Sequence, residues 1–215
     1  RCAMKGYKIF TILLVAVWLV FALSASALHL FENDANRIGL AVGTSALAPI
    51  AVFFLAYAVS RRFRQLALSS DPGILTAAQT ARIIGFTFLV LEARGALPAV
   101  FALPAGYGDI FIGATATLVA WKLARPGRRN SFIFWQALGI ADLVVAVGAG
   151  TSAGLLGPHA ASMAAMTVLP LSLIPTFLVP LFAIFHIICI AQARSWKSAR
   201  ERGEQIPGMV EPRAI

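Results

Sequence analysis

Charged residues are scarce in this sequence of 215 residues. Asp, Glu, Lys and Arg together make up 13% of it, whereas 59% of the residues are hydrophobic. Soluble domains contain about a quarter charged residues. The composition therefore argues against a single water-soluble domain and in favour of a protein that lies in a lipid bilayer.

Cysteines and recognisable catalytic motifs are equally sparse. The two cysteines, Cys2 and Cys189, lie far apart in unlike surroundings, so the sequence indicates neither a disulfide framework nor a thiolate metal site. It contains no P-loop, no G-x-S-x-G, no H-E-x-x-H and no C-x-x-C motif. We therefore expect no metal centre, and an enzymatic role is disfavoured.

Long hydrophobic runs are the feature that the sequence does have. A membrane-spanning helix needs roughly 20 mostly apolar residues, and six segments meet this requirement: 9–29, 38–60, 77–97, 106–123, 132–155 and 166–193. The sequence thus predicts an all-α, polytopic transmembrane bundle of six helices over residues 1–194, followed by a polar tail over 195–215. Pro170, Pro175 and Pro180 should kink the sixth helix.

The first apolar segment has a second interpretation. Lys5 and Lys8 precede it, and the pattern Ala25-Ser26-Ala27 is typical of a signal-peptide cleavage site. The run of about 20 apolar residues exceeds the 7–15 that are usual for a signal peptide. We therefore expect this segment to be retained as a spanning helix.

Basic residues outnumber acidic ones, 18 to 9. With six crossings, all Lys and Arg residues except Arg37 and Arg94 fall on one side, Arg82 included. The positive-inside rule then predicts a multi-pass protein of the cell inner membrane with both termini cytoplasmic. Basic residues at helix ends attract anionic lipid head groups on the cytoplasmic face, so the net charge of +9 does not require a nucleic-acid partner.

Three charges stand together in the stretch "LEARGALPAVFALPAGYGD". Glu92 and Arg94 are expected at the outer end of the third helix, with Pro98 and Pro104 in the outer turn. Asp109 is expected at the start of the fourth helix, where a carboxylate complements the helix dipole. A hairpin would pair Arg94 with Asp109 or Glu92. This group is either a structural ion pair or an outer vestibule for a polar solute or a proton.

Asp142 is the strongest single candidate for function. It lies near the middle of the fifth helix, and small residues such as Gly139 and Ala146 share its face. Small residues permit close helix packing, so Asp142 should face the bundle. It either holds two helices together through hydrogen bonds or forms a proton or cation site.

The three histidines are weaker candidates. His186 lies in the sixth helix, where a lone histidine is more often a hydrogen-bonded packing residue than a ligand. His29 and His159 are both expected at the outer face, where two histidines at similar depth could hold a haem or a metal. Their spacing does not select that outcome, so no cofactor is assigned.

Three stretches carry a resemblance to known proteins: "FALPAGYGDIFIG", "FWQALGIADLVVAVGAG" and "LPLSLIPTFLVPLFAIFHI". They resemble a group of small, uncharacterised bacterial integral membrane proteins over roughly residues 77–193. The matching positions are Gly106, Gly108, Asp109, Leu138, Gly139, Asp142, Pro170, Pro175, Pro180 and His186. The resemblance implies an integral membrane protein and directs attention to Asp109, Asp142 and His186, but it implies no activity.

Three classes of function remain open. A small-solute or ion transporter or channel, linked to protons, would use Asp142, Asp109, Glu92 and Arg94 along its pathway. A non-catalytic accessory subunit of a larger membrane complex would use the same residues for packing, and this class is weighted equally. A membrane-embedded enzyme or haem and redox protein has less support because the histidines and acids are scattered along the sequence. A dry, packed interior both around Asp142 and between Arg94 and Asp109 would favour the accessory subunit, and a hydrated cleft would favour transport.

Overall fold

The structure, a computed structural model, describes residues 2–32, 40–156 and 160–196, and within these ranges it contains helices and no strands. The elements, in chain order, are α1 (Cys2–Ala27), α2 (Leu40–Val59), α3 (Arg61–Leu68), α4 (Pro72–Ala77), the 3-10 helix η1 (Ala78–Gly85), α5 (Phe86–Ala93), α6 (Ala99–Leu123), η2 (Pro126–Arg128), α7 (Arg129–Leu156), η3 (Ala160–Thr167), the π-helix η4 (Ile174–Leu178) and α8 (Val179–Ser195). The predicted all-α fold is confirmed.

Six segments of the described chain are long and apolar enough to cross a membrane: Ile9–Ala27, Ala41–Val59, Pro72–Ala93, Ala99–Leu123, Pro126–Gly154 and Ile174–Ser195. The third of these is a continuous rod made of α4, η1 and α5. Large apolar side chains such as Phe10, Val59 and Phe134 are exposed along these segments. Such extensive exposed apolar surface is typical of contact with lipid. The expected number of spans is confirmed.

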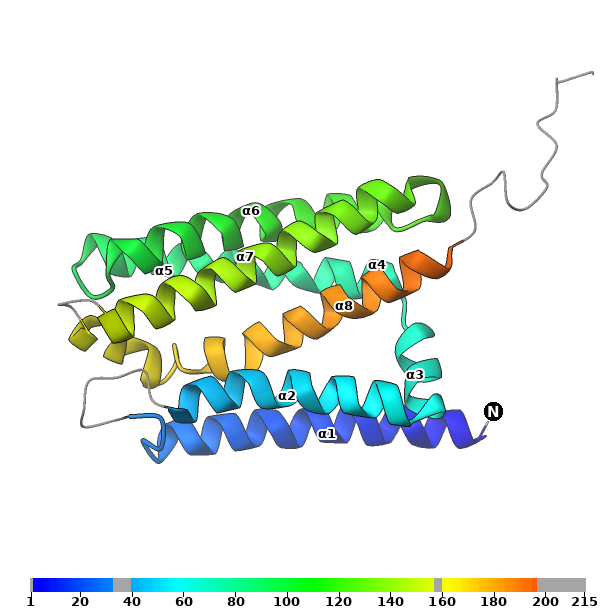
Figure 1. Cartoon of the computed structure of the whole chain (residues 1–215), viewed down its shortest axis with the longest axis horizontal. Coiled ribbons are helices and arrows are strands. Elements are labelled where there is room, and N and C mark those ends of the chain that lie inside the picture. The colour runs from blue at the N-terminus through cyan, green and yellow to red at the C-terminus, as the bar shows by residue number, and fades with distance from the viewer. Residues whose placement is uncertain (1, 33–39, 157–159, 197–215) are drawn as a thin grey trace, which may run out of the picture.

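The helices form two groups that α8 joins (Figure 1). In this view α1 and α2 run along one edge of the molecule, α4 to α7 form the other group, and α8 runs between them in contact with α2, α4 and α7. The short helix α3 crosses the end of the bundle. The N-terminus, α3, the α6–α7 turn and the end of α8 all lie at this same end, which we call the basic end.

The third, fourth and sixth spans begin at residues that differ from the predicted ones for identifiable reasons. The third begins at Pro72, not near residue 77, because the side chain of Asp71 caps the backbone N–H groups of Gly73 and Ile74. The fourth begins at Ala99, not near 106, and Pro104 lies inside it rather than in the outer turn. A helix tolerates an internal proline within a membrane protein when neighbouring helices satisfy the freed carbonyl. The sixth begins only at Ile174, in the proline-rich π-helical turn.

The buried core of the larger group consists of two apolar layers. One contains Phe88, Phe101 and Met163, and the other contains Ile112, Phe132 and Trp135. Asp109 and Asp142 lie between the two layers in sequence along α6 and α7. The interior of the bundle therefore has a polar layer between two hydrophobic ones.

Candidate functional site

Arg82 is the centre of the polar layer. Its side chain is 1% exposed, and its Nε donates to Oδ1 of Asp109 at 2.7 Å. Nη2 donates to the carboxylate of Asp142, while Nη1 lies 3.3 Å from the carbonyl of Gly139 and 3.5 Å from Nε2 of His186. A buried guanidinium is stable only when it is paired and hydrogen-bonded, and four groups surround this one.

The prediction for Arg82 was therefore wrong. The sequence placed it among the basic residues at the cytoplasmic edge, because "ILTAAQTARIIG" is only weakly apolar. The helix begins earlier, at Pro72, so Arg82 lies near the middle of a 22-residue span. We define Arg82, Asp109 and Asp142 as the ion cluster.

The two carboxylates reach the ion cluster from different helices. Asp109 lies near the middle of α6, not at a helix start as predicted, because α6 begins at Ala99. Asp142 faces the bundle interior from α7, as predicted. Each side chain is 13% exposed, and each carboxylate has one oxygen that accepts no hydrogen bond within the described chain.

The charges of the ion cluster do not cancel. One guanidinium faces two carboxylates, so with both carboxylates ionised the cluster carries one excess negative charge. An uncompensated charge at mid-depth in a membrane costs several kcal/mol. The cluster therefore requires a proton or a cation to be neutral.

Three glycines allow the helices to approach this closely. A β-carbon at Gly85 would overlap Asp109, one at Gly108 would overlap the carboxylate of Asp142, and one at Gly139 would overlap the ring of His186. Small residues at such positions let helix backbones come together. Close packing at these three glycines therefore helps to fix the positions of Asp109, Asp142 and His186.

A chain of hydrogen bonds runs from the ion cluster toward the basic end. The hydroxyl of Thr76 donates to the carbonyl of Pro72 at 2.7 Å and accepts from Nε2 of Gln136 at 2.9 Å. The carbonyl oxygen of Gln136 then lies 2.5 Å from Nδ1 of His186. Because that oxygen can only accept, Nδ1 carries the proton and Nε2 is left to accept from Arg82.

This arrangement defines the role of His186. Both ring nitrogens are used by protein groups, so His186 is a hydrogen-bonded residue of the interior, as the sequence favoured, and offers no free lone pair to a haem iron. Gln136 and Thr76, both fully buried, were not predicted. In the sequence, each is a single polar residue within an apolar helix. That pattern alone does not show whether the side chain is buried against a hydrogen-bond partner or exposed.

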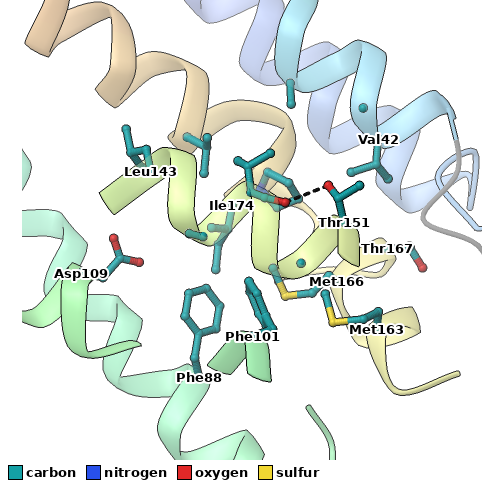
Figure 2. A pocket seen from close by; sticks show the side chains of 17 residues that line it. Val42, Phe88, Phe101, Asp109, Leu143, Thr151, Met163, Met166, Thr167 and Ile174 are labelled. Atoms are coloured by element: carbon teal, nitrogen blue, oxygen red, sulfur yellow. Dashed lines mark hydrogen bonds between the residues drawn. The ribbon is translucent and has the colours of Figure 1, made fainter. Parts of the chain in front are cut away.

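On the other side of the ion cluster lies a cavity of about 100 Å³. Among the described residues that line it, Asp109 is the one that is acidic or basic, and the walls that they form are almost entirely apolar (Figure 2). The cavity is lined by residues from the start of α2, the start of α5, the first half of α6, the second half of α7, η3, η4 and the start of α8. It therefore lies in the half of the bundle away from the basic end.

The remaining predicted site residues do not join the cluster. Arg94 is exposed and Glu92 half-buried, and neither forms an ion pair with any residue that the structure describes. The expected pairing of Arg94 with Asp109 is wrong because the longer α6 moves Asp109 into the bundle. His29 is exposed and pairs with Glu32 three residues on, and His159 lies outside the described residues. Within the described ranges, no three His, Cys, Asp or Glu residues are grouped to hold a metal ion.

Comparison with known proteins gives one match. The family model of a domain of unknown function, DUF8737, matches residues 37–194. No curated protein and no solved structure has significant similarity to the chain. The matched range includes the ion cluster and His186. Because the match extends over more than half of the sequence, the chain belongs to the DUF8737 family.

Proposed function

We propose that this protein is a multi-pass protein of a bacterial inner membrane that carries a small solute or ion across the bilayer in a proton-linked manner. Asp109 and Asp142 are the groups that bind the proton. The observation that carries the proposal is the excess carboxylate of the ion cluster, in which one guanidinium faces two acids inside the bundle. Ionisable residues at this depth commonly mark substrate or proton pathways.

The surroundings of the ion cluster support a pathway. The cavity reaches Asp109 from one end of the bundle, and the hydrogen-bonded chain through His186, Gln136 and Thr76 extends toward the other end. The ion cluster thus lies between a half of the bundle that contains a cavity and a half that is linked by hydrogen bonds. Alternating access requires such a barrier on one side of a central site.

The π-helical turn η4 is the proposed hinge for movement of the hydrogen-bonded barrier that contains His186. It lies next to the cavity, to which it contributes Ile174 and Pro175. Pro175 and Pro180 cannot donate backbone hydrogen bonds, and π-helical turns are frequent at functional sites. In the proposed cycle, bending at η4 shifts α8, and with it His186, relative to the ion cluster.

An accessory subunit is the second candidate, and one observation favours it. The three glycines close tightly around the ion cluster, as expected of a structural connection between η1, α6 and α7. In that case the cluster only stabilises the helices and no proton crosses the bundle.

Proton flux separates the two candidates. The purified chain is reconstituted into vesicles that contain a pH-sensitive fluorophore, and a potassium gradient with valinomycin imposes a negative interior. We expect faster acidification than in protein-free vesicles, and Asp142→Asn should reduce the rate to that of protein-free vesicles while the variant remains folded. Asp71→Asn is the matched control, because Asp71 is exposed at the N-cap position of α4 and asparagine is also a good N-cap. Equal rates for the wild type and protein-free vesicles would support the accessory subunit.

A further inference from the structure

We propose that the cavity beside Asp109 binds a small organic ammonium ion, with the charged group at the carboxylate and the apolar body along the cavity wall. This inference names the class of solute for the proposed transport, and in that respect it rests on the proposed function. Binding itself is a property of the cavity and is measurable on its own.

The sign of the ligand's charge follows from the charged groups that line and adjoin the cavity. Within the part of the chain that the structure describes, Asp109 is the one charged residue in the lining, and the ion cluster to which it belongs has one negative charge in excess. An anion would add to that excess in a medium of low dielectric constant, whereas a cation cancels it. A proton and an ammonium ion satisfy the same charge, so the two compete for the same carboxylate.

The geometry of Asp109 leaves one acceptor for the ligand. Arg82 holds Oδ1 at 2.7 Å, whereas Oδ2 accepts no hydrogen bond from the part of the chain that the structure describes. The side chain retains 13% exposure at the cavity. An ammonium N–H that donates to Oδ2 would make a charge-assisted hydrogen bond, the strongest kind available there.

The cavity wall suits an apolar body that carries a positive charge. Figure 2 shows the rings of Phe88 and Phe101 between Asp109 and the methionines Met163 and Met166. The two ring centroids lie 5.2 Å apart. Aromatic rings attract a cation within about 6 Å, and methionine side chains adapt to ligands of varied shape.

The volume limits the ligand to a few carbon atoms. The cavity measures about 100 Å³, whereas an engineered cavity of about 150 Å³ accommodates benzene. A straight alkyl chain is narrower than a benzene ring. Butylammonium is therefore a suitable probe, and 1-butanol and butyrate are its neutral and anionic counterparts.

Titration calorimetry on the full chain in nanodiscs tests the inference. We expect saturable binding of butylammonium chloride, and neither 1-butanol nor butyrate should saturate at the same concentrations. Ala146→Phe fills the cavity from α7 without altering the ion cluster, and it should abolish the binding. Ala141→Phe places the same ring on an exposed part of α7 and should bind as the wild type does.

Each other result overturns either the inference or the proposed function. Equal binding of 1-butanol would show a purely apolar cavity, and unchanged binding in Ala146→Phe would place the ammonium site elsewhere. If butylammonium did not bind saturably but proton flux still depended on Asp142, the ligand class would be rejected and the proposed function would stand. Binding without proton flux would reject the proposed function and leave the ammonium site standing.

Discussion

Gly108 lies against the carboxylate of Asp142 with no room for a β-carbon between them. In Gly108→Ala the carboxylate must move, and the movement separates it from Arg82. Overpacking of this kind costs about 1–3 kcal/mol, and here it also weakens a buried ion pair. We therefore expect a clear fall in the midpoint of thermal unfolding, measured by circular dichroism in detergent.

Gly148→Ala provides the matched control for Gly108→Ala. Gly148 lies in α7, and a β-carbon there meets nothing within 4 Å. Its unfolding midpoint should stay at the wild-type value or rise slightly, because alanine is the better helix former. If the two variants unfolded at the same temperature, close packing at the ion cluster would not contribute to stability.

At this scale the sequence correctly predicted the position of one of the three residues of the ion cluster, Asp142. The small residues around Asp142 correctly indicated that it faces the bundle. The partner could not be predicted, because Arg82 is 60 residues away in sequence from Asp142 and 27 from Asp109. Pairing between residues so far apart depends on the tertiary fold, and one sequence shows only that each charge is unusual in its segment.

Helix α3 is an amphipathic element that the sequence showed only as a basic connection. Ser60 caps it by accepting from the N–H of Phe63. Leu66 and Ala67 are buried, whereas Arg61 and Arg62 are exposed. The spacing of Phe63, Leu66 and Ala67 is helical and would have indicated this helix, had the arginines not been interpreted solely as topology signals. The long spans were easier to predict because composition alone identifies them.

The position of α3 across the basic end (Figure 1) predicts contact with lipid head groups. Basic residues near an anionic surface contribute about 1 kcal/mol each. The double variant Arg61→Gln with Arg62→Gln should therefore lose about 2 kcal/mol of preference for phosphatidylglycerol over phosphatidylcholine. Native mass spectrometry of lipid adducts from mixed nanodiscs measures this preference.

The control for the α3 variant is Gln65→Ala, which alters an exposed, uncharged residue of the same helix. It should keep the wild-type lipid preference. A double variant that also kept it would mean that α3 does not contact the lipid surface.

The six spans alternate in direction through the molecule, so successive turns lie at opposite ends (Figure 1). Within the described residues, one end holds Lys5, Lys8, Arg61, Arg62, Arg64, Lys122, Arg125, Arg128, Arg129 and Arg194, and the other holds Arg94. The charge asymmetry thus persists although Arg82 belongs to the interior. It is the physical basis of the proposed orientation, with the basic end in the cytoplasm.

Labelling of single cysteines in cells tests that orientation. The background protein carries Cys2→Ser, and its remaining cysteine, Cys189, is fully buried. Ala93→Cys then introduces a thiol at the end of α5, and Gly127→Cys introduces one in the α6–α7 turn. Both positions are exposed. A membrane-impermeant maleimide should label Ala93→Cys in intact cells and Gly127→Cys only after permeabilisation. The background protein without either substitution should stay unlabelled in both conditions. The reverse pattern would place the basic end outside, and the cavity beside Asp109 would then face the cytoplasm and act in export from that side.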